Sequence, residues 1–225
     1  MTLLSIPVLL FAVVIHEVSH GWMAERLGDP TARYAGRLTL NPLPHLDLFG
    51  SILLPAMLLL SRAPFLFGYA KPVPVNPYNL RNPKKDMMWV GFSGPAANFA
   101  TALCCGFLFR FLFHQNVTGI VGTFVGLLSI GVIINIILAI FNLIPIPPLD
   151  GSKILMGFLP PEHEYTFRSL ERYGFLILLG ILFIGPMVGL NIFGWIIAIF
   201  GNPFCLLFTG YTLGQLNTIA HILLS

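Results

Sequence analysis

The sequence predicts an all-α polytopic membrane protein with about five to six transmembrane helices and a re-entrant extended element. Of its 225 residues, 56% are hydrophobic and only 9% are charged, whereas a soluble domain carries charge on about a quarter of its residues. The mean hydropathy is +0.84. The apolar residues form long runs that are separated by proline, glycine and charged residues. We expect one membrane-embedded domain over 1–225, with a core at 3–160 and C-terminal helices within 173–224.

The first apolar run predicts a membrane helix over 3–27. No Lys or Arg precedes this run and no small-residue cleavage site follows it, so we expect a retained span rather than a removed signal peptide. Gly28-Asp29-Pro30 supplies helix-breaking residues that end the helix.

The segment 49–77 predicts the re-entrant element. The apolar run at 49–61 is shorter than the roughly 20 residues that a crossing helix needs. Lys71-Pro72-Val73-Pro74-Val75-Asn76-Pro77 has prolines at alternate positions, which exclude a helix and favour extended backbone. Such backbone is tolerated at membrane depth only against protein or a water-filled cavity. We expect 49–70 to return to the side it entered from, and the proline-rich stretch to be able to pair with an extended peptide.

Four later apolar segments predict further helices, at 87–113, 119–143, 173–200 and 204–224. Small residues in Ser93-Gly94-Pro95-Ala96-Ala97-Asn98 allow close helix approach, and the proline opens a local break. We expect a polar loop over 152–172, and breaks at Gly185-Pro186 and at Gly201-Asn202-Pro203.

The basic residues predict the orientation in the membrane. If 49–70 does not cross, only Arg110 of the 12 Lys and Arg residues lies on one face. The other face then holds Arg26, Arg33, Arg37, Arg62, Lys71, Arg81, Lys84, Lys85, Lys153, Arg168 and Arg172. By the positive-inside bias, this face is the cytoplasmic one. The same layout makes the helices at 3–27 and 119–143 parallel, which brings their carboxyl ends to one side.

Charge and cysteine content argue against other classes of protein. The net charge is only +3, and no aromatic residues are interleaved with the scattered basic ones, so we expect no nucleic-acid partner. Cys104, Cys105 and Cys205 have neither metal-ligand nor disulfide spacing. We expect them to be small buried hydrophobes.

His16-Glu17-Val18-Ser19-His20 is the strongest chemical signal in the chain. Residues four apart share a helix face, so the two imidazoles can bind one metal ion while Glu17 faces the same pocket. This is the HExxH pattern of zinc hydrolases, in which the carboxylate does not bind the metal and acts as the base. The alternative is a polar patch that joins two helices. Because a charged carboxylate facing lipid costs about 2.5 to 3.5 kcal/mol at mid-bilayer, a cluster without a role is the weaker interpretation.

A catalytic zinc needs a third protein ligand, and Asp150 is the best candidate. It follows an apolar helix and a proline-rich break, and Gly151 permits a tight bend after it. The alternative is an ordinary Asp-Gly turn at the membrane surface. Glu162, Glu164 and Glu171 are expected to be surface charge. His45 is expected to be a surface histidine, with an accessory role left open.

These motifs resemble the site-2 protease family of intramembrane zinc metalloproteases, in a minimal form without PDZ or CBS domains. The resemblance rests on the HEVSH motif and on Asn142-Leu143-Ile144-Pro145 with Leu149-Asp150-Gly151. It is supported by Asn41-Pro42 with His45 and Asp47, by 68–77 and by 93–98.

The resemblance implies one Zn²⁺ bound by His16, His20 and Asp150, with Glu17 as the catalytic base and Asn142 near the substrate backbone. It also implies that the substrates are transmembrane proteins or peptides in a lipid bilayer. The expected location is a bacterial cytoplasmic membrane, with the active site toward the cytoplasm.

Two other functions remain open at this point. A membrane transporter could bind zinc at these residues without hydrolysis, although a pure binding site does not need the unliganded Glu17. A non-catalytic scaffold with a structural zinc would need a fourth ligand, for which His45 is the only nearby candidate.

Overall fold

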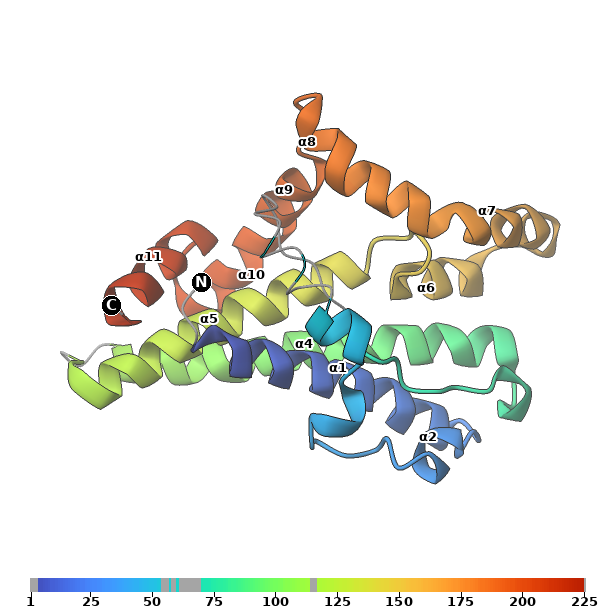
Figure 1. Ribbon diagram of the computed structural model, residues 1–225, viewed down its shortest axis with the longest axis horizontal. Helices are drawn as coiled ribbons and strands as arrows, with labels where there is room; N and C mark the ends of the chain where they lie inside the picture. Colours follow the sequence, from blue (N-terminus) through green and yellow to red (C-terminus); the bar gives the residue numbers. More distant parts are fainter. Residues whose placement is uncertain (1–3, 54–56, 58–59, 61–69, 114–116, 225) are drawn as a thin grey trace.

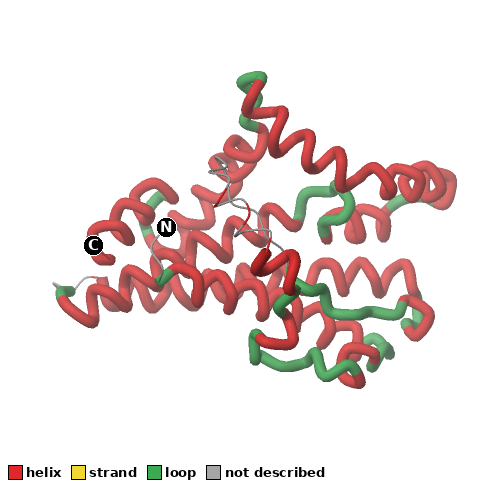
Figure 2. The backbone as a smooth tube through the Cα atoms, viewed as in Figure 1, coloured by secondary structure: helices red, strands yellow, loops and turns green. Residues whose placement is uncertain are grey.

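The computed structural model describes residues 4–53, 57, 60, 70–113 and 117–224, and these are helical with connecting loops and no strand (Figures 1 and 2). Five helical segments in this part of the chain are long and apolar enough to cross a bilayer: Ser5–Arg26, Pro83–Phe113, Gly119–Asn142, Ser169–Met187 and Ile192–Thr209. The predicted all-α polytopic architecture is confirmed. Of the predicted re-entrant stretch 49–70, the part after Leu53 lies almost wholly outside the described residues.

Three membrane helices form the centre of the molecule: α1 (Ser5–Arg26), α4 (Pro83–Phe113) and α5 (Gly119–Asn142). They lie side by side, with α1 and α5 running in the same direction and α4 running against them (Figure 1). The parallel course of α1 and α5 agrees with the prediction. It brings the end of α5 to the same region as the second half of α1.

Short helices pack against both ends of this bundle. Two helices near the carboxyl terminus, α10 (Asn202–Thr209) and α11 (Leu213–Leu224), place Phe208 and Leu216 in the main apolar core with residues of α4 and α5. At the other end, α6 (Asp150–Phe158) packs on α4. A Cβ atom at Gly91 of α4 would lie 3.1 Å from the Asp150 carbonyl oxygen. This small residue lets α6 approach closely enough to reach α1.

The predicted polar loop at 152–172 is wrong, because the chain there forms α6 and α7 (Pro161–Leu179). Pro161 occupies the first turn of α7, where a missing N–H has no consequence. Lys84 of α4 donates to the Leu159 carbonyl oxygen at 2.6 Å and pairs with Glu164. The charged residues on these helices therefore face water or the rim of the bundle. Because a loop has the same polarity in its sequence, polarity alone does not distinguish such helices from a loop.

The predicted breaks in the last third of the chain are also wrong. The continuous helices end at Gly189 and Gly210, both in the left-handed region at φ 81° and φ 85°, a conformation that favours glycine. Between them lie the helical pieces α9 (Ile192–Ile196), a π-helix at Ile197–Gly201 and α10. Pro203 does not interrupt this run because it sits in the first turn of α10. Cys205 is buried as expected, whereas Cys104 is exposed.

The proline-rich stretch forms no helix over 70–76, its Asn76 has extended backbone (φ −103°, ψ 104°), and it is hydrogen-bonded to the segment that follows α1. Lys71 N donates to the His45 carbonyl oxygen at 2.9 Å, and Arg37 donates to the Lys71 carbonyl oxygen at 2.6 Å. At the other end, Asn76 N donates to Asp29 Oδ2 at 2.6 Å. These contacts hold the extended backbone alongside the second half of α1.

Asp29 is a buried carboxylate that joins three parts of the chain. It accepts hydrogen bonds from Thr31, from Asn76 N and from Asn79 Nδ2 at 2.8 Å. Burial acts to raise the pKa of Asp29, but the hydrogen bonds from Thr31, Asn79 and Asn76 outweigh it and the pKa is lowered. The folded state therefore favours the ionised form.

Replacing Asp29 by Ala is expected to destabilise the protein by about 2 to 3 kcal/mol, because donors at 31, 76 and 79 lose their acceptor. The stabilisation from the ionised carboxylate is full above the unfolded pKa of about 4 and is lost as the pH falls through the lower folded value. Thermal unfolding in detergent, measured across this pH range, should show the loss in the wild type and not in Asp29→Asn. Equal pH dependence in the two proteins would contradict the assignment.

Candidate metal centre

His16 and His20 face one another across a single turn of α1. Their Nε2 atoms are 3.1 Å apart and both residues are 6% exposed. The four-residue spacing produces this geometry, since such residues lie one above the other on a helix.

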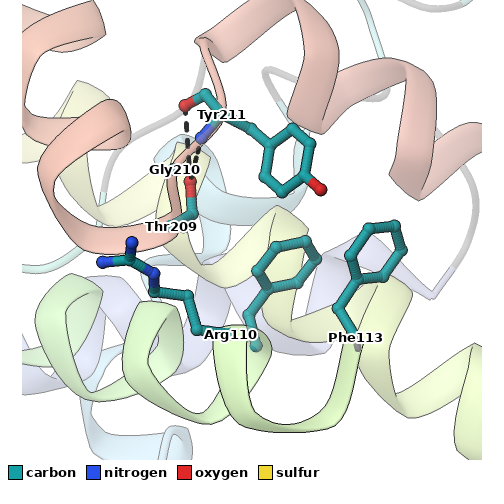
Figure 3. A pocket seen from close by; sticks show the side chains of 6 residues that line it. Arg110, Phe113, Thr209, Gly210 and Tyr211 are labelled. Carbon is teal, nitrogen blue, oxygen red and sulfur yellow. Dashed lines mark hydrogen bonds between the residues drawn. The ribbon is translucent and has the colours of Figure 1, made fainter. Parts of the chain in front are cut away.

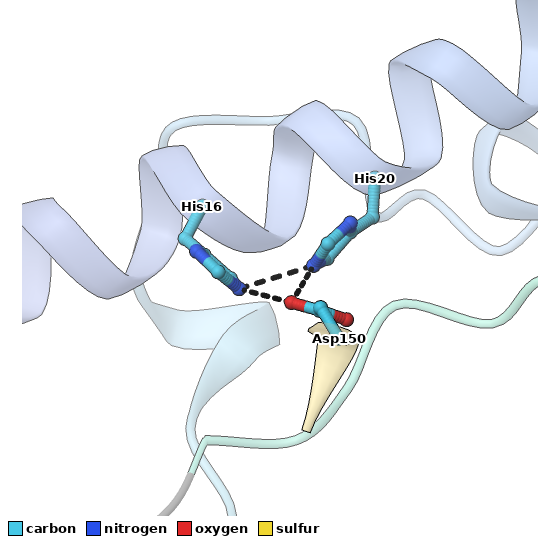
Figure 4. A group of neighbouring side chains, drawn as sticks. All are labelled: His16, His20 and Asp150. Carbon is cyan, nitrogen blue, oxygen red and sulfur yellow. Dashed lines mark hydrogen bonds and ion pairs between the residues drawn. The ribbon is translucent and has the colours of Figure 1, made fainter. Parts of the chain in front are cut away.

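Asp150 reaches the same point from the start of α6. Its Oδ2 atom lies 3.0 Å from His16 Nε2 and 3.1 Å from His20 Nε2 (Figure 4). Its other oxygen, Oδ1, accepts a hydrogen bond from Lys153 Nζ at 2.8 Å. Within the described part of the chain, these three are the only group of His, Cys, Asp and Glu side chains close enough to hold a metal ion.

The hydrogen bonds around the two rings show which nitrogen atoms are unprotonated and direct their lone pairs at the cluster. His20 Nδ1 lies 2.7 Å from the Val90 carbonyl oxygen. A carbonyl oxygen can only accept, so this nitrogen carries the proton and Nε2 of the neutral ring does not. His16 Nδ1 lies 2.6 Å from Asn98 Oδ1. Two imidazole lone pairs and a carboxylate oxygen therefore converge on one another, an arrangement that a cation stabilises.

The size and shape of this cluster fit zinc. With zinc–nitrogen bonds of about 2.0–2.1 Å, neighbouring ligand atoms of a tetrahedron lie about 3.3 Å apart, close to the separations found here. Gly94 of α4 makes room for the rings, because a Cβ atom there would lie 2.5 Å from His20 Cε1 and 2.7 Å from His16 Cε1. Two imidazoles and one carboxylate are also a usual ligand set for catalytic zinc.

Glu17 lies beside the cluster. Its Oε2 atom accepts a hydrogen bond from Val73 N at 2.8 Å. It lines a cavity of about 320 Å³ that also holds His16, His20 and Asp150, with Pro72, Val73, Val75, Met87, Val90, Asn142, Pro148 and Lys153 around them. The cavity thus brings a free carboxylate, the potential metal ligands and the extended segment together.

The remaining predicted residues lie in different surroundings. Asn142, at the end of α5, lines the same cavity and donates from Nδ2 to the Leu138 carbonyl oxygen at 3.0 Å. The prediction that His45 is a surface histidine is wrong, since it is 1% exposed and its Nε2 lies 2.9 Å from the Thr39 carbonyl oxygen. It is not among the clustered residues, so it gives no support to a closed structural zinc site.

A second cavity, of about 280 Å³, lies near the other end of α4. It is lined by Phe109, Arg110, Phe113, Thr209, Gly210 and Tyr211 (Figure 3). At about 1.5 Å per helical residue, Arg110 is about 24 Å along α4 from Gly94. Its guanidinium donates to the Leu207 carbonyl oxygen at 3.4 Å. Arg110 therefore caps the end of α10, away from the candidate metal centre.

Several residues of the site were not predicted from the sequence to be functional. Lys153 carries a visible signal, because it follows Asp150 by one helical turn. Asn98 and Gly94 appear only as part of a small-residue motif. The contribution of Val73 comes from its backbone N–H, which no residue pattern reveals.

Comparison with known proteins identifies the family. The family model described as peptidase family M50 matches residues 115–185. A Bacillus subtilis protein named "Putative zinc metalloprotease YwhC" is 37% identical over 183 residues, which cover 80% of this chain and 79% of that protein. Rip2 of Mycolicibacterium smegmatis, named in the same way, is 30% identical over 77% of this chain and 64% of its own length. Rip2 of Mycobacterium tuberculosis strain H37Rv is 27% identical over a stretch that covers 83% of this chain and 67% of that protein. No solved structure matches the chain significantly.

The similarity to YwhC spans most of both proteins, and it agrees with the buried His-His-Asp cluster and the apolar helices. The chain belongs to peptidase family M50, the site-2 protease family of zinc metalloproteases.

Proposed function

We propose that this zinc metalloprotease is an intramembrane endopeptidase, which cleaves peptide bonds of membrane-spanning substrates near the cytoplasmic side of the bilayer. One observation carries the proposal: the buried cluster of His16, His20 and Asp150 is built on a membrane-crossing helix and on the chain that follows another. A hydrolytic centre on these elements meets substrates that lie in or beside the membrane.

We assign the metal ligands to His16, His20 and Asp150. Zinc at this position supplies Lewis-acid polarisation of the scissile carbonyl and makes water a better nucleophile near neutral pH. Lys153 holds Asp150 Oδ1 at 2.8 Å, so the other carboxylate oxygen is directed at the two imidazoles. The cavity beside these residues has room for an extended peptide backbone.

We assign the general base to Glu17. Its carboxylate belongs to the same cavity and is not one of the three clustered donors. It takes a proton from the attacking water and returns it to the leaving nitrogen. The hydrogen bond from Val73 N at 2.8 Å orients the carboxylate.

Asn142 is proposed to bind the substrate backbone. Its amide lines the cavity and is bonded only within its own helix, to the Leu138 carbonyl oxygen. Turning the side chain would let Nδ2 donate to the oxygen atom on which negative charge develops. An amide provides this donor without adding a charge.

The extended segment 70–76 is the proposed partner for an unwound substrate. A transmembrane helix hides its peptide bonds in internal hydrogen bonds, so it must unwind before cleavage. Pro72, Val73 and Val75 line the cavity, and their backbone is extended. Pairing by strand addition would hold the unwound stretch beside Glu17.

The proposed location is the cytoplasmic membrane of a bacterium, with the site toward the cytoplasm. The support is the distribution of Lys and Arg residues and the bacterial origin of the relatives. The proposal also treats 1–225 as one membrane-embedded domain with its core at 3–160.

The test uses purified protein in liposomes with a fluorescent transmembrane peptide that carries helix-breaking residues near its cytoplasmic end. We expect cleavage inside the apolar segment, as located by mass spectrometry. Chelation with 1,10-phenanthroline should stop it and added zinc should restore it. A zinc-dependent activity that cuts only soluble peptides, never the membrane-embedded one, would contradict the proposal.

A further inference from the structure

Two buried asparagine side chains connect the candidate metal centre to the middle of α5. His16 Nδ1 lies 2.6 Å from Asn98 Oδ1, and Asn98 Nδ2 donates to Asn135 Oδ1 at 2.7 Å. Asn98 is 0% exposed and Asn135 is 2% exposed. The chain of contacts therefore crosses all three central helices without reaching solvent.

The direction of these hydrogen bonds is fixed at the far end. Asn135 Nδ2 lies 2.9 Å from the Gly131 carbonyl oxygen, which can only accept a hydrogen bond. The amide oxygen of Asn135 must therefore face Asn98, and it needs a donor there. The Asn98 NH₂ group supplies it, and its second hydrogen goes to the Ala12 carbonyl oxygen at 3.1 Å. Both donors of Asn98 are used, so only its oxygen is left for His16.

The state of the His16 ring follows from this order. Because Asn98 Oδ1 can only accept, Nδ1 of the neutral imidazole carries the proton and Nε2 presents its lone pair. Nε2 is the atom that lies 3.0 Å from Asp150 Oδ2. The same tautomer is enforced at His20 by the Val90 carbonyl oxygen at 2.7 Å. Asn135 on α5 is thus linked to the His16 ring on α1 through Asn98.

We propose that Asn98 and Asn135 are positioning residues, which together hold His16 in the tautomer and orientation needed to bind the metal. The proposal rests on the assignment of His16 as a ligand. Burying two amides among three membrane helices is unfavourable unless each polar atom is paired, and here the pairing ends at His16 Nδ1, on the ring whose Nε2 is the proposed ligand atom. Partners of this kind typically change metal affinity by 10- to 100-fold when they are removed.

Variants of Asn98 separate positioning from packing. Asn98→Leu keeps the branched shape of the side chain and removes its acceptor and donors, whereas Asn98→Asp keeps an acceptor for His16 and removes the amide donors. We expect chelator competition to show zinc affinity weakened by about 10- to 100-fold in Asn98→Leu, with a smaller loss in Asn98→Asp. Thr101→Val is the matched control on α4, since among the described residues Thr101 Oγ1 bonds only to the Ala97 carbonyl oxygen of its own helix. The zinc affinity of this variant should equal that of the wild type.

A second measurement does not depend on bound metal. In zinc-free protein at about pH 9, where imidazole is neutral, the ring ¹⁵N shifts of His16 should show a protonated Nδ1 in the wild type. Asn135→Leu leaves Asn98 in place and removes one of the two acceptors that orient its amide, with the Ala12 carbonyl oxygen remaining, so we expect the second tautomer to appear beside the first. Ser129→Ala is the control on α5, because in the part of the chain that the structure describes Ser129 Oγ bonds only to the Val125 carbonyl oxygen of that helix.

The outcomes distinguish failure of the positioning role of Asn98 and Asn135 from failure of the assignment of His16 as a metal ligand. Wild-type zinc affinity in Asn98→Leu, equal losses in Asn98→Leu and Asn98→Asp, or an unchanged His16 spectrum in Asn135→Leu would each overturn the positioning role. Absence of zinc binding in the wild type would instead remove the ligand assignment, and the tautomer measurement would still decide whether the two amides act on His16.

Discussion

Glu17→Gln is expected to abolish peptide-bond cleavage while one zinc ion per chain stays bound. Glutamine has the same shape and can still accept the Val73 N–H bond on its amide oxygen, but it cannot take a proton from water. Loss of a general base lowers the rate by about 10²- to 10⁴-fold. The metal should remain, because Glu17 is not one of the three clustered donors.

The measurement pairs turnover of a transmembrane peptide in liposomes with zinc content by atomic emission. Asp150→Asn and His16→Ala serve as the contrast, since both are expected to lose zinc and activity together. Wild-type turnover by Glu17→Gln would remove this residue as the base. Loss of zinc from Glu17→Gln would make it a ligand instead.

Gly94→Ala is expected to weaken zinc binding by at least about 100-fold, which corresponds to about 2.7 kcal/mol. The added methyl group would lie 2.5 Å from His20 Cε1 and 2.7 Å from His16 Cε1, closer than atoms in contact can approach. Either the rings turn away from Asp150 or α4 moves away from α1, and in both cases the three ligand atoms separate.

Chelator competition measures this loss, and Gly180→Ala is the matched control because a Cβ atom there meets nothing within 4 Å. Retention of proteolysis and of zinc affinity in Gly94→Ala would show that the rings have more room than the structure gives them. Alanine stabilises helices relative to glycine, so a loss at 94 and not at 180 points to the steric contact.

The central helices and the candidate ligands could be predicted because their signals are local. Long apolar runs gave the positions of α1, α4 and α5, and the four-residue spacing of His16 and His20 placed both on one helix face. Asp150 required a topological argument, namely that α1 and α5 run in parallel. The shortness of the apolar run at 49–61 and the charge distribution together supplied that step, since one misplaced crossing would have put Asp150 at the far end of the bundle.

The rest depends on contacts between distant segments, which a single sequence does not contain. Asn135 lies in an apolar helix. Burying its polar side chain at membrane depth is unfavourable without a hydrogen-bond partner, but the sequence does not show that this partner is Asn98. His45 is a polar residue between loops, and its carbonyl oxygen accepts a hydrogen bond from Lys71 N of the distant proline-rich stretch. The segment that forms α6 and the start of α7 is polar, so its pattern resembles a loop until the packing of α6 on α4 and the Lys84–Glu164 ion pair are known.

Membership of peptidase family M50 decides between the functions left open by the sequence. A transporter or a scaffold with structural zinc would not need a free carboxylate beside the metal ligands. In this protein Glu17 is a carboxylate outside the cluster of His16, His20 and Asp150, and it lines the same cavity as these proposed ligands. The protein is therefore a zinc metalloprotease, and the proposed intramembrane substrate follows from where its cluster is built.

The most direct measurement is an anomalous difference map at the zinc edge, from crystals of the zinc-loaded protein. The account predicts a single strong peak within bonding distance, about 2.0–2.2 Å, of Nε2 of His16, Nε2 of His20 and Oδ2 of Asp150. A peak bound elsewhere, or a fully occupied zinc site from which Asp150 is absent, would contradict it.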